Sequence, residues 1–224
     1  MQGWTLVFDL DGTLVDTAPD LVAATNYVMK QLRLEDVSET SIRPYVGHGA
    51  QAMIERASAE QGRVLSAVEL RDLFGVFIAH YTANIAANSK PYPGVLDALN
   101  LCRQRGATLA VCTNKMESHA RSLLSALHMT YYFKAITGRD SLLVCKPDPG
   151  HLTGTVALAL GRSEKAIMIG DSETDILTAK AAGIPVIAVN FGYSLEHVAT
   201  FAPNAVIGHY RDLVSVAEKL MSGT

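Results

Sequence analysis

The sequence has few cysteines, no long apolar run and no cluster of like charges. Its three cysteines are odd in number and widely spaced, which argues against a disulfide framework or a cysteine metal cluster. No apolar stretch approaches the roughly 20 residues that a membrane-spanning helix needs. Lys and Arg are scattered through a chain of net charge −3, which argues against nucleic acid as a partner. Because no basic segment leads into a signal-type core near residue 1, we expect a cytoplasmic protein without a membrane partner.

The chain does have enough apolar residues for a sizeable core. It is 49% hydrophobic over 224 residues, which suffices for one main core and a smaller second one. Short runs rich in branched residues predict strands at residues 4–8, 108–112, 166–169, 186–189 and 205–207. Apolar residues at helical spacing predict helices around residues 95–102, 120–127 and 152–160. Strands that alternate with helices predict an α/β fold, a Rossmann-like parallel sheet with helices on both faces.

One long stretch breaks this alternation. Residues 15–88 contain helical patterns and no convincing strand, so we predict a small inserted α-helical cap domain there. Its first helix is expected to begin near Thr17, and its last begins with a capping box from Ser66 to Glu69. The core domain is then formed by residues 1–14 and 89–224.

Polar motifs follow the predicted strands at the point where each strand ends. In chain order, these candidate site residues are Asp9 and Asp11 in an Asp-x-Asp-Gly-Thr segment, then Thr113 and Asn114, then Lys146 in Lys-Pro-Asp-Pro, then Asp171 and Asp175. Ligands of open parallel sheets bind at the carboxyl ends of the strands, near the point where the strand order reverses. We therefore expect these side chains to converge on one site.

As a set, these four segments resemble the haloacid dehalogenase superfamily of phosphotransferases, and the insertion falls between the first and second of them. A further resemblance, to bacterial phosphoglycolate phosphatases, rests on residues 8–21, 46–49, 112–115, 138–140 and 144–149. The resemblance implies the α/β core of this superfamily with an inserted cap. It also implies that the protein hydrolyses phosphoric monoesters. It also implies 2-phosphoglycolate as the substrate, hydrolysed to glycolate and phosphate.

The resemblance also implies a role for each motif residue. Asp9 would attack phosphorus to form an aspartyl-phosphate, and Asp11 would act as general acid and then general base. Asp9, Asp171 and the main-chain carbonyl of Asp11 would hold Mg²⁺ through hard oxygen ligands. Phosphate oxygens would be bound by Thr113, Asn114 and Lys146.

The sequence leaves open the role of Asp175 and the identity of the residues that select the substrate. Asp175 is either a supporting partner of the metal or of Lys146, or a solvated acid in the first turn of a helix. Substrate choice is expected to involve the loop with Gly47, His48 and Gly49, where His48 could donate to a substrate carboxylate. Further cationic candidates for that role are Lys115, Arg56 and Arg139, and the last two are equally interpreted as surface or salt-bridge residues.

Several functions share the same motifs. A sugar phosphomutase of the β-phosphoglucomutase type, a pyrophosphatase or a promiscuous sugar-phosphate phosphatase fits the same scaffold, and a non-catalytic phosphate-binding protein is a further alternative. Dehalogenation is disfavoured because that chemistry needs no Mg²⁺ site. We expect a small phosphate ester as the partner, no nucleic acid, and either a monomer or a homodimer.

Overall fold

The computed structural model describes residues 1–194 and 196–223 and divides into two compact units. The first contains Met1–Val15 and Pro91–Thr224, and the second contains Asp16–Lys90. The chain passes between the units in β2 (Val15–Asp16) and β3 (Lys90–Pro91), which pair as a two-stranded sheet. These boundaries lie within two residues of those expected for a core with an inserted segment.

The first unit is built on a six-stranded parallel sheet with the strand order β5-β4-β1-β6-β7-β8. Its strands are β1 (Thr5–Phe8), β4 (Thr108–Cys112), β5 (Ala135–Thr137), β6 (Ala166–Gly170), β7 (Val186–Val189) and β8 (Ala205–Ile207). From β1 the chain builds outward through β4 to β5, then returns to the other side of β1 with β6. The strand order therefore reverses next to β1, which is where a ligand site is expected.

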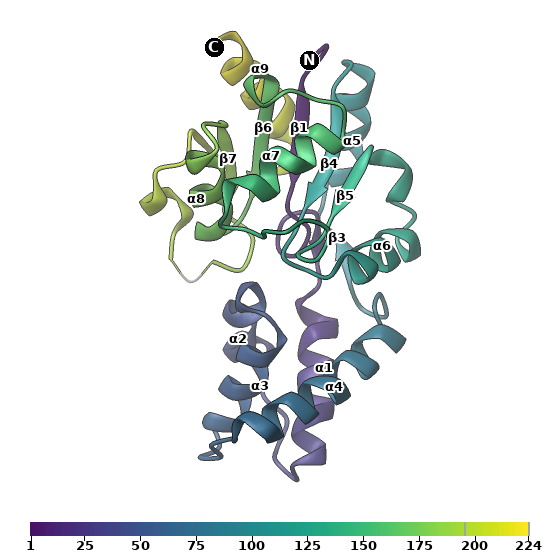
Figure 1. Ribbon diagram of the computed structural model, residues 1–224, viewed down its shortest axis with the longest axis vertical. Coiled ribbons are helices and arrows are strands. Elements are labelled where there is room, and N and C mark those ends of the chain that lie inside the picture. Colours follow the sequence, from purple (N-terminus) through teal and green to yellow (C-terminus); the bar gives the residue numbers. More distant parts are fainter. Residues whose placement is uncertain (195, 224) are drawn as a thin grey trace. The chain divides into compact units, whose positions relative to one another are not determined.

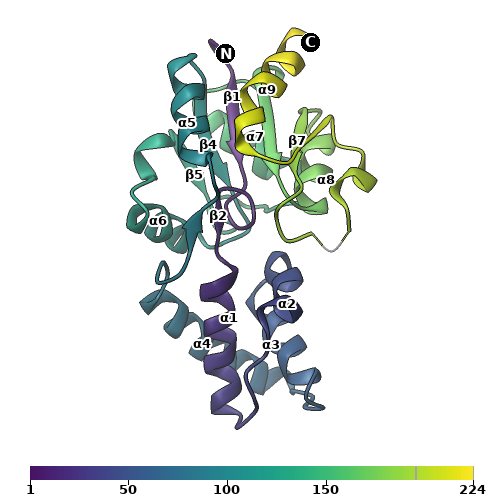
Figure 2. The same ribbon diagram turned by 180° about the vertical axis from the view of Figure 1, so that it is seen from behind.

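Helices cover both faces of this sheet. They are α5 (Val95–Gln104), α6 (Glu117–Ala126), α7 (Pro149–Leu158), α8 (Glu173–Ala181) and α9 (Leu213–Ser222). Short 3₁₀ turns complete the unit at Thr130–Tyr132, Ser163–Lys165, Val198–Phe201 and Tyr210–Asp212. Figure 1 shows α7 and α8 in front of the sheet, and Figure 2 shows α5 and α9 over the opposite face. The predicted α/β class with a parallel sheet between two helical layers is confirmed.

The central strands are apolar because both of their faces are buried. Every residue of β1 and β6 is buried, as parallel strands covered on two sides require. Phe8 pairs with Val111 of β4 and with Ile169 of β6, so the three strands end at the same level. Asp9 and the residues that follow β4 and β6 therefore emerge at one edge of the sheet.

The sequence patterns missed some elements of this unit. β5 has three residues, Ala-Ile-Thr, with a single large aliphatic side chain, so its strand pattern is weaker than that of the equally short β8, Ala-Val-Ile. Helix α9 was not predicted either, although its first residues, Leu213 and Val214, are buried.

The second unit is helical. It contains α1 (Ala18–Gln31), α2 (Glu39–Ile42), a 3₁₀ helix at Arg43–His48, α3 (Ala50–Ala59) and α4 (Ala67–Ala83). Helices α1, α3 and α4 pack against one another. The predicted capping box at Ser66 and Glu69 is present at the start of α4. In the described part of the chain, no helix is both long enough and apolar enough to cross a membrane.

A buried carboxylate ties the two ends of this second unit together. Asp20, in the first turn of α1, is 3% exposed. It accepts hydrogen bonds from the main-chain N–H groups of Asn88 at 2.9 Å and Ser89 at 2.8 Å, and from the Ser89 hydroxyl at 2.6 Å. These charge-assisted bonds compensate the desolvated acid and hold the last residues of the unit against its first helix.

A buried histidine in the first unit fixes the segment that precedes α7. His151 is fully buried, and its Nδ1 atom accepts a hydrogen bond from the main-chain N–H of Lys146 at 3.2 Å. Burial and then the nearby charge of Lys146 lower the pKa of His151 to about 4. A proton on Nδ1 would also face the Lys146 N–H donor, so the neutral imidazole is the form that fits the fold.

This histidine predicts a pH-dependent component of stability. Its pKa is lower in the folded protein than its ordinary value of 6.5, so its contribution is complete above pH 6.5 and is lost as pH falls toward 4. His151→Gln keeps an acceptor for the Lys146 N–H and removes the titration. Between pH 7 and pH 4.5, the unfolding free energy of the wild type should fall by about 2 kcal/mol more than that of the variant. Urea unfolding at both pH values measures this difference, and parallel pH profiles for the two proteins would contradict it.

Candidate active site

The ammonium group of Lys146 joins two buried carboxylates at the carboxyl edge of the sheet. Its Nζ atom lies 2.8 Å from Oδ1 of Asp9 and 2.6 Å from Oδ1 of Asp175. The three side chains are 3%, 12% and 0% exposed. Burial alone would lower the pKa of Lys146, but the charges of Asp175 and Asp9 outweigh burial and raise it. Lys146 therefore stays charged.

Asp175 is held in place by the start of helix α8. Its Oδ2 atom accepts from the Ser172 hydroxyl at 2.6 Å and from the Ser172 N–H at 3.1 Å, while its own N–H donates to the Ser172 hydroxyl. The full burial of Asp175 excludes the alternative of a solvated acid. Asp171 does not share a helix face with Asp175, although four residues separate them, because α8 begins at Glu173 and Asp171 precedes its cap.

Asp171 is oriented by the loop that follows β1. Its Oδ1 accepts from the Thr13 hydroxyl at 2.7 Å, and its Oδ2 accepts from the main-chain N–H of Tyr193 at 2.8 Å. A Cβ atom on Gly12 would lie 2.4 Å from Oδ2, and the φ angle of Gly12 is +81°, so glycine is required at this close approach. The hydroxyl of Tyr210 donates to the carbonyl of Thr13 at 2.8 Å and anchors the same loop.

The acids of this edge carry more negative charge than Lys146 compensates. Carboxylate oxygens of Asp9, Asp171 and Asp175 all lie within 4.8 Å of one another. Burial, opposed by Lys146, raises the pKa of Asp9 to about 6, and burial together with Asp175 and Asp9 raises that of Asp171 to about 8. Hard oxygen donors with excess negative charge form a set that suits a divalent cation such as Mg²⁺.

The end of β4 contributes the next pair of predicted residues. Thr113 is 2% exposed, and its N–H donates to the carbonyl of Thr137 in β5 at 3.0 Å. The side-chain amide of Asn114 donates to the carbonyl of Lys146 at 2.9 Å. This bond connects the turn after β4 to the segment that carries the ammonium group.

Asp11 makes a separate ion pair. Both of its carboxylate oxygens bond to Nζ of Lys115, at 2.8 and 3.0 Å. Among the described side chains, the cluster of acids with metal-ligand spacing contains Asp175 rather than Asp11. The expected contribution of Asp11 to a metal is through its main-chain carbonyl, for which the carboxylate need not enter the cluster.

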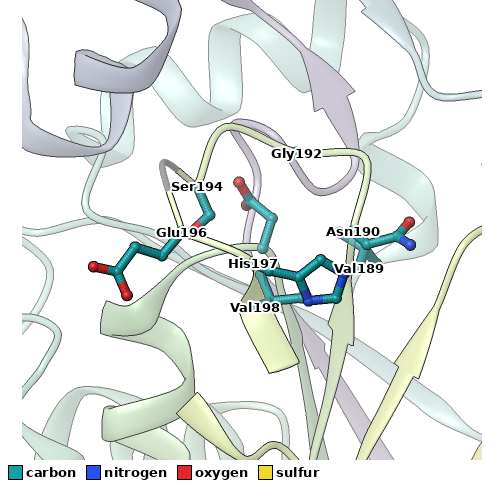
Figure 3. A pocket seen from close by; sticks show the side chains of 8 residues that line it. Val189, Asn190, Gly192, Ser194, Glu196, His197 and Val198 are labelled. Atoms are coloured by element: carbon teal, nitrogen blue, oxygen red, sulfur yellow. The ribbon is translucent and has the colours of Figure 1, made fainter. Parts of the chain in front are cut away.

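A cavity of about 260 Å³ opens beside Asp171. Figure 3 shows the side chains around it, which come from the last residue of β7 and the segment after it, together with Asp171 after β6. The described residues that line it are Asp171, Val189, Asn190, Gly192, Ser194, Glu196, His197 and Val198. The edge of the sheet is therefore hollowed on the β7 side of Asp171.

The predicted specificity residues fall in both units. Gly47, His48 and Gly49 belong to the helical unit, whereas Lys115 and Arg139 belong to the unit with the sheet. Within the helical unit, the Tyr45 ring lies 6.1 Å from the His48 ring, and the guanidinium of Arg56 lies 5.4 Å from the Tyr45 ring centre. His48 and Arg139 are exposed.

Sequence reasoning missed several residues that shape this site. Tyr193 contributes a main-chain N–H, which every residue except proline has, so nothing in its side chain signals the role. Tyr210 reaches Thr13 from 197 positions away in the chain. Thr13 was part of the first motif, and its contact with Asp171 could be suspected only once the two loops were known to meet.

Comparisons with known proteins show which family the chain is similar to. The model of the family described as haloacid dehalogenase-like hydrolase matches residues 6–189. A protein of Mesorhizobium japonicum named phosphoglycolate phosphatase is 51% identical over 96% of both chains. One of Agrobacterium fabrum with the same name is 43% identical over 96% of this chain and 93% of that one.

Solved structures give the same result. The crystal structure of a protein from Haemophilus somnus, titled a predicted phosphoglycolate phosphatase, has a TM-score of 0.89 at 28% identity. The match covers 96% of this chain and 98% of that one. These similarities favour an enzyme over the phosphate-binding protein that the sequence left open. The chain belongs to the haloacid dehalogenase-like hydrolase family and is one of its phosphatases.

Proposed function

We propose that the protein is a Mg²⁺-dependent phosphatase that hydrolyses 2-phosphoglycolate to glycolate and phosphate through an aspartyl-phosphate on Asp9. The observation that carries the chemistry is the buried contact of Lys146 with Asp9, beside Asp171 at the carboxyl edge of the sheet. The substrate assignment is supported by relatives that are 35–51% identical and are named phosphoglycolate phosphatases.

The acids of the site have distinct tasks in this proposal. The Asp9 carboxylate attacks phosphorus, and the bond from phosphorus to the glycolate oxygen breaks. Asp11 gives its proton to the departing oxygen and then takes a proton from the water that hydrolyses the aspartyl-phosphate. Asp175 is a positioning residue, because its two oxygens are engaged by Lys146 and Ser172.

The cationic and polar groups stabilise the transferring phosphoryl group. Lys146 supplies a fixed positive charge where negative charge spreads in the transition state, and Thr113 and Asn114 offer further donors. Asp9, Asp171 and the main-chain carbonyl of Asp11 would hold Mg²⁺. When bound, this ion would screen the repulsion between the phosphate dianion and the attacking carboxylate.

We further propose that the loop with Gly47, His48 and Gly49 contributes to substrate choice. His48 and Arg56 both approach the ring of Tyr45, so two groups able to donate to an anion lie around one aromatic side chain. A substrate carboxylate would be recognised by such donors.

Replacing the nucleophile tests the chemical part of the proposal. Asp9→Asn removes the attacking carboxylate and leaves the volume of the side chain almost unchanged. We expect Mg²⁺-dependent release of phosphate from p-nitrophenyl phosphate and from 2-phosphoglycolate to fall by about three orders of magnitude or more. Thermal unfolding should show a folded variant. A variant that stays near the wild-type rate would rule out Asp9 as the nucleophile.

Replacing the loop histidine tests its part in substrate choice. His48→Ala should raise KM for 2-phosphoglycolate by about tenfold and change KM for p-nitrophenyl phosphate by less than threefold, since only the first substrate has a carboxylate. Steady-state kinetics on both substrates measures this, and the second substrate serves as the control. Equal increases in both KM values would count against a carboxylate-binding loop.

A further inference from the structure

The ion pair between Lys115 and Asp11 stands at the same edge of the sheet as the catalytic acids but apart from the Lys146 cluster. Nζ of Lys115 bonds to both oxygens of Asp11, at 2.8 and 3.0 Å. The Lys115 and Asp11 side chains are 7% and 16% exposed. Both oxygens of Asp11 accept from the ammonium group, so a departing substrate oxygen that approached Asp11 would meet a carboxylate already paired with a cation.

The main chain of Lys115 is held on several sides. Its N–H donates to the Thr113 hydroxyl at 3.2 Å, and its carbonyl accepts from the Arg139 N–H at 3.0 Å. A Cβ atom on Gly138 would lie 2.6 Å from that carbonyl oxygen, so the loop after β5 presses against it. The backbone is therefore fixed, and any movement of the charge has to come from the flexible four-carbon side chain.

A lysine in this position can exchange one carboxylate for another at little net cost. The carboxylate of Asp11 and a carboxylate on a substrate are the same chemical group, so the ammonium keeps an ion pair throughout the exchange. A substrate without a carboxylate offers no such partner. With a carboxylate-bearing substrate Asp11 would lose its ion pair with Lys115, whereas with the other kind of substrate it would keep that ion pair.

We propose that Lys115 recognises the carboxylate of the substrate by leaving Asp11, and that this exchange frees Asp11 to act on the departing oxygen. The inference rests on the proposed function and adds a specificity-determining residue to it. An ester without a carboxylate cannot draw Lys115 away, so it reacts while Asp11 is still paired with Lys115. Selectivity for carboxylate-bearing esters then appears in kcat. The contribution of His48, in contrast, is to KM.

The test compares 2-phosphoglycolate with ethyl phosphate, which has the same two-carbon chain without the carboxylate. In the wild type, kcat should favour 2-phosphoglycolate by at least about 100-fold, as expected where a polar partner is required. In Lys115→Met this kcat ratio should fall to within a few-fold of one. Lys115→Arg, which keeps a cation, should retain an intermediate ratio.

The matched control is Lys165→Met, because Lys165 is exposed and directly precedes β6, so it lies at the opposite end of the strand from the site. This variant should keep the wild-type ratio. If Lys115→Met does not fold, Lys115→Gln replaces it, since glutamine can still donate to Asp11 but has no charge. The expected ratio is the same as for Lys115→Met.

The outcomes separate the inference from the proposed function. If kcat on the two esters falls by the same factor in Lys115→Met and Lys115→Gln, Lys115 is merely structural and the inference is wrong. The inference is also wrong if Lys165→Met loses the ratio to the same extent, because the effect would then not depend on the position of Lys115. If the wild type does not hydrolyse 2-phosphoglycolate, or if Asp9→Asn hydrolyses it at the wild-type rate, the proposed function itself fails.

Discussion

The bond network around the Lys146 ammonium is the interaction on which the arrangement of the site depends. It links the end of β1, the turn before α7 and the first turn of α8 through two carboxylates, one of them fully buried. A buried ion pair of this kind is weak evidence for stability, because desolvation opposes the Coulomb attraction. Its effect is to position the acid and the cation, which are held in one geometry before any ester binds.

Two lysine–aspartate pairs lie at the carboxyl edge of the sheet and differ in their burial. The pair of Lys146 and Asp9 is embedded, with additional support from Asp175, whereas that of Lys115 and Asp11 is slightly more open. In the proposed mechanism, the embedded pair would stabilise the charge that spreads over phosphate oxygens, and the more open pair would exchange its partner to recognise the departing group. The difference follows from what surrounds each lysine rather than from the residue types.

Sequence patterns predicted the parallel sheet and the loops that carry the acids, because strand periodicity and motif position are local properties. They did not determine the environment of Asp175, since its burial depends on Gly170, against which its side chain packs without room for a Cβ atom. The acceptor role of His151 was equally invisible, because a histidine two residues into α7 reads as an ordinary helical position. The pairing of Lys115 with Asp11 joins residues 104 positions apart and needed coordinates.

The hydrogen bonds of Asp20 bear on how the inserted segment can be replaced in evolution. Because one carboxylate fastens Asn88 and Ser89 to the first helix of the same segment, the insertion closes upon itself with its own hydrogen bonds. None of the ladder bonds of the six-stranded sheet depends on it. A different insertion with the same distance between its two ends could therefore replace this one. The sheet and the acids at its carboxyl edge would stay the same.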